Sequence, residues 1–310
     1  MKNNNFTVIT AGMSYLDIDA HACIVAAAEL FQMKGERVIA YSNAPRNYSI
    51  CQSLVREVPI ARSLPLDVSP KNAAYIIVDV SDPDFLKDSV PLDQVTAIYD
   101  HHTGFETYWQ SRIGENAHIE FIGAAATLIY REWKKAGLQE RMSDSTAKLL
   151  IAAILDNTLN LTSSNTTPED IETFNVLCRK ADVGAAWCAA YFSEVQKSVE
   201  ADLENALFND VKNLQNNPVL PSHMAQLCVW DASSILLRLQ EIRQWFQKRW
   251  DSWLINIIDI QHRCGYFVCD EPEPQKELEK LFGIQFEKDI AKLPVPYLRK
   301  EIIKKTKSTS

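Results

Sequence analysis

Short apolar segments alternate with helix-forming ones in the first half of the chain, and this alternation restricts the fold more than any other feature. Residues 6–10 read as a strand, residues 20–34 as an Ala-rich helix and residues 37–41 as a second strand. Strand, loop, helix and strand in this order open a parallel sheet. A further strand is predicted at 117–122. We therefore predict an α/β protein whose amino-terminal sheet is mainly parallel and flanked by helices.

Several of the predicted strands are followed by an acid or a histidine. Asp79 follows the apolar strand predicted at 73–78, and Asp100 follows the strand predicted at 95–99. The other such groups are Asp17 and Asp19 in the loop after the first strand, His101 and His102 after Asp100, and Asp156 after the apolar helix predicted at 144–155. Ligands bind at the carboxyl ends of parallel strands. Acids gathered there repel one another and call for a cation between them.

This set of acids and histidines has the composition of a divalent-metal site. Carboxylates with neutral imidazole suit Mn²⁺, Mg²⁺ or Co²⁺, and the set lacks the thiolates of structural zinc sites. Asp17 and Asp19 alternate across one residue, so their carboxylates can serve two ions, which Asp79 could bridge. Two ions in such a site can activate water for an in-line displacement at phosphorus. Taken alone, residues 100–102 also fit a solvated polar loop.

The second part of the chain repeats the α/β texture after a charged, helical stretch. Residues 184–213 read as helical, and we place a domain boundary near Phe192. The predicted domains are 1–191 and a smaller α/β domain at 192–310. Strands are predicted there at 224–229, 252–260 and 265–269, with helices at 233–249 and 275–282. Near the end of the chain, Arg299 and Lys300 could bind phosphates, but they also fit a solvated basic tail.

Overall charge and cysteine content exclude several classes of protein. The net charge is −8 and the pI is about 5.4, which argues against broad nucleic-acid binding. No apolar run is long enough for a membrane span, and the first residues lack the apolar core of a signal peptide. The seven scattered cysteines fit reduced thiols. We therefore expect a cytoplasmic protein, and the phosphorus chemistry of the predicted metal site favours a small phosphorylated substrate.

The ordered motifs resemble those of the DHH phosphoesterase superfamily. The motifs are Asp17-x-Asp19, Val78-Asp79, Asp100-His101-His102 and Asp156. Residues 155–167 resemble the fourth motif of family II inorganic pyrophosphatases and prune-type exopolyphosphatases, and residues 123–128 are similar to their Gly-Ser-Cys-Ala-Thr stretch. Residues 209–212 and 298–300 resemble their second-domain Asp-x-Lys and Ser-Arg-Lys-Lys segments. The resemblance therefore spans nearly the whole chain.

The resemblance implies a role for each of these residues. It implies a metal-binding catalytic domain at 1–191 and a substrate-binding domain at 192–310, with the active site in the cleft between them. Asp17 and Asp79 would hold one metal ion, and Asp19, Asp79, His101 and Asp156 would hold the other. The catalytic residues would be Asp79, His102 and Asp100, with His102 facing the substrate phosphate and Asp100 supporting the metal shell. Lys212, Arg299 and Lys300 would grip the phosphates.

The first motif departs from the family pattern. Met13 stands where the pyrophosphatases have a histidine, and a thioether is a poor ligand for a hard ion, so the first of two Mn²⁺, Mg²⁺ or Co²⁺ sites is expected to be weak. His21 could supply an imidazole, but at a helix entrance it more often packs or caps. The resemblance also allows a homodimer through an edge strand.

Three functions are consistent with these residues. The leading expectation is metal-dependent hydrolysis of phosphoanhydride bonds in pyrophosphate or short polyphosphate by metal-activated water. A phosphodiesterase acting on short or cyclic oligonucleotides is the first alternative. Relatives with that role carry a Gly-Gly-Gly-His motif, and this chain has no Gly-Gly pair. A catalytically weakened phosphate- or nucleotide-binding regulatory protein is the second alternative, and Met13 is its main support.

Overall fold

The computed structural model describes residues 6–12, 15–55, 60–66, 68–86, 88–214 and 217–307. The chain divides into two compact units, Met1–Tyr191 and Phe192–Ser310. Each unit contains a five-stranded sheet. Across the described ranges, no helix combines the length and the apolar character that crossing a bilayer requires.

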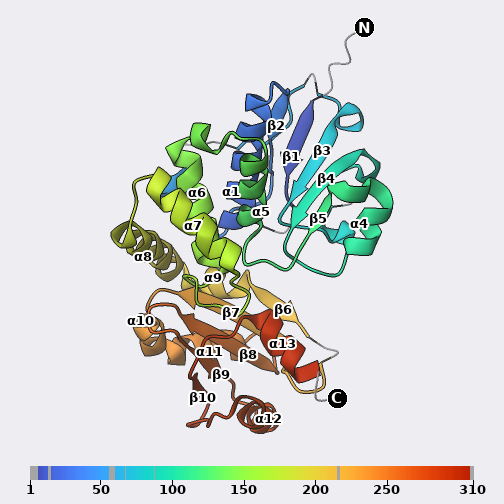
Figure 1. Cartoon of the computed structure of the whole chain (residues 1–310). Helices are drawn as coiled ribbons and strands as arrows, with labels where there is room; N and C mark the ends of the chain where they lie inside the picture. The colour runs from blue at the N-terminus through green and yellow to red at the C-terminus, as the bar shows by residue number, and fades with distance from the viewer. Residues whose placement is uncertain are drawn as a thin grey trace. The chain divides into compact units, whose positions relative to one another are not determined.

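A parallel sheet forms the centre of the first unit (Figure 1). Its strands are β1 (Thr7–Thr10), β2 (Val38–Ala40), β3 (Ala74–Val78), β4 (Val95–Asp100) and β5 (Ala117–Ile119). They are ordered β2-β1-β3-β4-β5, and every neighbouring pair is parallel. This confirms the predicted α/β fold. β5 ends at Ile119, short of the predicted end at 122, because the chain leaves the sheet there and turns at Gly123 into the next helix.

Helices cover both faces of this sheet. The helices of this unit are α1 (Ile18–Met33), α2 (Gln52–Val55), α3 (Pro83–Leu86), α4 (Glu106–Ile113), α5 (Ala125–Lys135), α6 (Asp144–Asn157) and α7 (Pro168–Lys180), with 3-10 turns η1 (Pro70–Asn72), η2 (Leu92–Gln94), η3 (Gly114–Asn116) and η4 (Gln139–Arg141). The next helix, α8 (Ala185–Ala201), includes the boundary between the two units. Trp109 of α4 packs with Tyr75 and Ile77 on one face. On the other face α1 contacts α5 and α6 (Figure 1). The small side chains of α1 are buried nearly all round, which allows this close packing.

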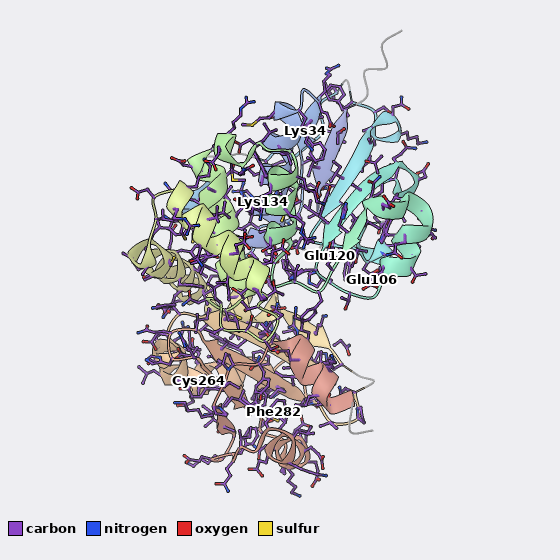
Figure 2. The ribbon with its side chains drawn as sticks, in the orientation of Figure 1. Lys34, Glu106, Glu120, Lys134, Cys264 and Phe282 are labelled. Atoms are coloured by element: carbon purple, nitrogen blue, oxygen red, sulfur yellow. The ribbon has the colours of Figure 1, made fainter. Side chains whose placement is uncertain are left out.

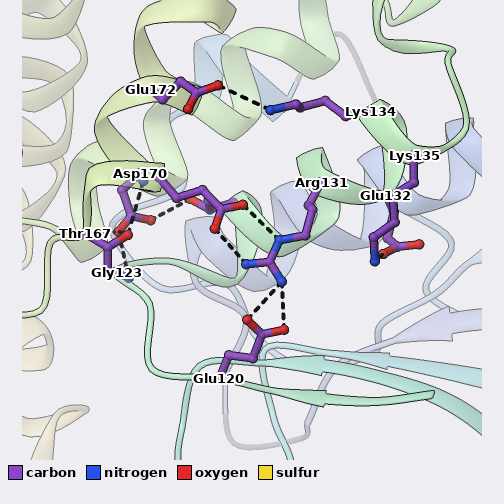
Figure 3. A network of polar contacts seen from close by, with 11 residues as sticks. Glu120, Gly123, Arg131, Glu132, Lys134, Lys135, Thr167, Asp170 and Glu172 are labelled. Carbon is purple, nitrogen blue, oxygen red and sulfur yellow. Dashed lines mark hydrogen bonds and ion pairs between the residues drawn. The ribbon is translucent and has the colours of Figure 1, made fainter. Parts of the chain in front are cut away.

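The turn into α5 is fixed by Asp170 of α7 (Figure 3). One carboxylate oxygen of Asp170 accepts the Gly123 N–H at 2.9 Å, and the other accepts the Thr127 hydroxyl at 2.6 Å. A Cβ at position 123 would lie 2.6 Å from Asp170, so only glycine fits this approach. Thr167 and Asp170 form the capping box of α7.

An arginine strengthens the same contact between helices. Arg131 of α5 donates to Glu120 after β5 at 2.7 Å and to Glu169 of α7 at 2.7 Å (Figure 3). Lys134 pairs with Glu172 one turn further along the two helices. These contacts hold the first turn of α5 at the carboxyl end of the sheet, beside the residues of the predicted metal site.

The second unit contains a mixed sheet. Its elements are α9 (Leu203–Phe208), β6 (Val211–Asn213), β7 (His223–Val229), α10 (Ser233–Leu237), α11 (Leu239–Gln247), β8 (Trp253–Asp259), β9 (Cys264–Val268), α12 (Pro272–Phe282), β10 (Ile290–Leu293) and α13 (Arg299–Lys307). The strand order is β10-β9-β8-β7-β6, in which only β7 and β8 are parallel. Phe282, which is labelled in Figure 2, packs edge-to-face on Phe267 in the core of this unit.

Two helix predictions in this region are wrong in detail. Residues 184–213 contain two helices and a strand, because residues 211–213 pair with β7 rather than extending the helix. The helix predicted at 233–249 is broken at Arg238, whose N–H donates to Ile235, into α10 and α11.

Candidate metal centre

The start of α1 places two aspartates at the carboxyl end of β1. Asp17 is the N-cap of α1, and its Oδ1 accepts the Ala20 N–H at 2.9 Å. Asp19 is fully buried in the first turn of α1. Its two oxygens accept the N–H groups of Ala125 at 2.8 Å and Ala126 at 2.9 Å, which open α5. Burial, followed by repulsion from Asp17, raises the pKa of Asp19 to about 7.

Asp79 lies directly after β3 in a strained backbone conformation. Its φ is 59°, in the left-handed region, and its N–H donates to the Tyr99 carbonyl at 2.8 Å. Its side chain is 6% exposed. Burial, then repulsion from Asp19 and Asp17, raises the pKa of Asp79 well above its ordinary value. The structure thus brings Asp17, Asp19 and Asp79 together, as the strand ends predicted.

His101 faces Asp79 in a way that a cation would stabilise. The His101 Nδ1 lies 3.2 Å from the Ile122 carbonyl, which can only accept, so Nδ1 carries the proton. The other ring nitrogen, Nε2, lies 3.4 Å from Asp79 Oδ1. Within the described residues, that buried oxygen has no hydrogen-bond partner. A lone pair therefore faces a carboxylate oxygen, which fits a divalent ion held between them.

His102 is oriented by Asp100. Asp100 Oδ1 accepts the His102 N–H at 3.1 Å and Nδ1–H at 2.9 Å. Burial raises the pKa of Asp100, but the hydrogen bonds and charge of His102 outweigh it, so the pKa is lowered. The His102 side chain is 57% exposed. Ligand atoms of Asp79, His101 and His102 lie within 4.8 Å of one another. His102 is therefore close enough to Asp79 and His101 to bind a metal ion with them, although the resemblance implies that it contacts the substrate.

Asp156 lies in the last turn of α6, not after it as predicted. The helix continues to Asn157 because the Thr158 N–H and hydroxyl both donate to the Ile154 carbonyl. Asp156 Oδ1 accepts the Tyr191 hydroxyl at 3.2 Å. Burial and then repulsion from Asp17 raise the pKa of Asp156 to about 7, so this acid also faces the group.

The structure adds two polar side chains that the sequence did not predict. The Cys23 thiol lies 3.4 Å from Asp19 Oδ1, and its spacing of four residues on a helix was the available signal. Tyr191 lies 35 residues from Asp156, so no local pattern points to it. His21 is fully buried, as expected for a packing role. Burial and then Arg46 lower the pKa of His21 to about 4, which keeps it neutral.

Three predicted phosphate-binding residues lie in the second unit. Arg299 opens α13, and its guanidinium donates to the side chain of Asp210 at 2.5 Å and to the Met224 carbonyl at 3.4 Å. Lys212 is exposed on β6, where its backbone pairs with Met224. Lys212 and Arg299 therefore both contact Met224 of β7. The charge of Arg299 is already paired with Asp210. Lys300 is exposed on α13, and Met13 lies outside the described residues.

Metal removal should make the stability of the protein fall as pH rises. Asp19 and Asp156 have pKa values of about 7 when folded and ordinary values of 3.8. Between these values the folded state holds protons that the unfolded state has lost, so the free energy of unfolding decreases with rising pH, by an amount on the order of a few kcal/mol. Saturating Mn²⁺ at pH 8 should restore it. Urea unfolding between pH 5 and pH 8, with EDTA or MnCl₂, measures both effects.

The Asp156→Asn variant is the control for this experiment, because it removes one titrating group. Its free energy of unfolding in EDTA should change less with pH than that of the wild type. Equal pH dependence in the two proteins would contradict the assignment of a raised pKa to Asp156.

Comparison with known proteins agrees with the resemblance expected from the motifs. No family model matches the chain. It is 24% identical over 304 residues to a Deinococcus radiodurans protein named as a probable manganese-dependent inorganic pyrophosphatase, covering 93% of each chain. An Exiguobacterium sp. protein with the same name is also 24% identical, over 316 residues and 96% of each chain.

Solved structures share the fold. A Methanococcus jannaschii protein assigned to the family II inorganic pyrophosphatases matches with a TM-score of 0.70 and 18% identity, over 97% of this chain and 98% of the other. An exopolyphosphatase-related protein from Bacteroides fragilis matches with a TM-score of 0.51 and 10% identity, over 98% and 91%. The chain thus has the fold of the family II inorganic pyrophosphatases and resembles manganese-dependent inorganic pyrophosphatases in sequence over nearly its whole length.

Proposed function

We propose that this chain is a divalent-metal-dependent hydrolase of phosphoanhydride bonds in pyrophosphate or short polyphosphate. The observation that carries the proposal is the approach of His101 Nε2, at 3.4 Å, to Asp79 Oδ1, which has no hydrogen-bond partner among the described residues. Burial and repulsion from the neighbouring acids raise the pKa of Asp79 well above its ordinary value. The names of the relatives support Mn²⁺ as the metal and pyrophosphate as a substrate.

The proposal assigns a role to each residue of this group. Two ions would be bound, one by Asp17 and Asp79 and the second by Asp19, Asp79, His101 and Asp156. The chemistry that such ions supply when bound is activation of water and neutralisation of phosphate charge. Asp79 would serve both ions, and Asp100 would hold the His102 ring so that Nε2, the nitrogen turned away from Asp100, meets a phosphate oxygen.

Phosphate release from three substrates tests the proposal. Protein dialysed against EDTA should release phosphate from pyrophosphate and tripolyphosphate once Mn²⁺ is added, and Mg²⁺ and Co²⁺ measure metal preference. A linear dinucleotide should remain intact. Cleavage of the dinucleotide alone would favour the phosphodiesterase. Metal-dependent binding of phosphates without turnover of any substrate would favour the regulatory protein.

A further inference from the structure

A short segment after β2 lies along the start of α1 and carries Arg46. Leu16 and Arg46 form a parallel bridge, in which the Leu16 N–H donates to Pro45 at 2.7 Å and the Asn47 N–H donates to Leu16 at 2.9 Å. Adjacent backbones in such a bridge lie about 4.8 Å apart, so the Arg46 backbone lies within about 9 Å of Asp17.

Hydrogen bonds of Ser49 connect residues 45–49 to the start of α1 and to Tyr191. The Ser49 hydroxyl accepts the Ile18 N–H at 2.9 Å, so the segment contacts the residues before and after Asp17. Asn47 Oδ1 accepts from both the N–H and the hydroxyl of Ser49. The Tyr191 hydroxyl, which donates to Asp156, also lies 3.1 Å from the Ser49 carbonyl. The backbone of Arg46 is therefore held beside Leu16, next to the predicted metal ligand Asp17.

Within the part of the chain that the structure describes, the guanidinium of Arg46 has no counterion. The side chain is exposed and, among the described residues, makes no hydrogen bond or ion pair. Its neighbour Arg62 differs, because that guanidinium donates to the carbonyls of Ala44 at 2.6 Å and Asn43 at 2.9 Å. Partial burial and then Arg62 lower the pKa of Arg46, so two positive charges lie close together. An anion at this position would relieve their repulsion.

We propose that Arg46 binds the outer phosphate of a phosphoanhydride substrate, the phosphate that does not undergo attack at the metal centre. The inference rests on the proposed function, and it places a phosphate-binding group within the first unit. A guanidinium offers a planar fork that bonds two phosphate oxygens at once.

Binding of a non-hydrolysable diphosphate tests this role without turnover. Calorimetry of the Mn²⁺-loaded full-length protein should show that Arg46→Gln weakens methylenediphosphonate binding about tenfold or more, since a charge-assisted bidentate contact is lost. The affinity of Arg46→Lys for methylenediphosphonate should lie between those of the wild type and Arg46→Gln. Affinity for orthophosphate, which has no outer phosphate, should change less than about twofold. Lys71→Gln is the matched control: it removes an exposed positive charge from η1, which precedes β3 and so lies away from the carboxyl ends of the strands, and it should bind the diphosphate like the wild type.

The outcomes separate this inference from the proposed function. Equal diphosphate affinity in wild type and Arg46→Gln would overturn the role of Arg46, even if pyrophosphate is hydrolysed. The same would follow if Arg46→Gln weakened orthophosphate and diphosphate equally, because the residue would then act on the metal-bound phosphate. Binding that depends on Arg46, without hydrolysis by the wild type, would support the site and contradict the proposed function.

Discussion

Replacing Asp79 with asparagine is expected to lower Mn²⁺-dependent release of phosphate from pyrophosphate about a thousandfold or more, which corresponds to about 4 kcal/mol of activation free energy. Asp79 interacts with three other acids of this site: after burial, repulsion from Asp19, Asp17 and Asp100 raises its pKa. Its Oδ1, which accepts no hydrogen bond from any residue that the structure describes, also faces His101. An amide has no negative charge, so it would weaken the attraction of both proposed ions at once.

Asparagine is the appropriate replacement because of the backbone at this position. Asp79 has a φ of 59°, which asparagine tolerates and alanine adopts with strain. The matched control is Asp84→Asn, which changes an exposed acid on α3 and should leave turnover unchanged. Kinetics with pyrophosphate, together with Mn²⁺ binding by calorimetry, measure the effect. If Asp79→Asn kept wild-type turnover, Asp79 would not be the ligand shared by the two proposed ions.

Much of the first unit could be predicted because its signals are local. The strands that end before Asp79 and at Asp100 are short apolar runs, and parallel strands necessarily bring their carboxyl ends to one edge. The capping box of Thr167 and Asp170 likewise depends on only four consecutive residues, 167–170. These features place the candidate metal ligands without knowledge of any distant contact.

The remaining features depend on contacts between distant residues. Lys212 lies on a strand because residues 211–213 find a partner in β7, whereas the local composition favours helix. Tyr191 of α8 donates to Asp156 of α6, which lies 35 residues earlier in the chain. The pairing of Arg299 with Asp210 joins residues 89 positions apart. Patterns over a few residues contain no information on such pairs.

Asp19→Ala should remove Mn²⁺-dependent turnover as fully as Asp79→Asn, but it should also destabilise the metal-free protein. In EDTA at pH 5, below its raised pKa of about 7, Asp19 is mainly uncharged and carries little cost of burial. Its oxygens still accept the N–H groups of Ala125 and Ala126. Leaving both N–H groups buried and unpaired should cost about 2–4 kcal/mol of unfolding free energy, measured with urea.

Two variants show whether this loss comes from the hydrogen bonds. Asp19→Asn retains one acceptor oxygen, so it should lose about half as much stability as Asp19→Ala while also losing turnover. Asp79→Asn should unfold like the wild type in EDTA at pH 5, because Asp79 Oδ1 accepts no hydrogen bond within the described residues. If Asp19→Ala were as stable as the wild type under these conditions, Asp19 would be a metal ligand without a part in holding α5. If the expected loss is found, the same carboxylate both binds the ion and fixes the first turn of α5, so metal binding and the packing of α5 on α1 are energetically coupled.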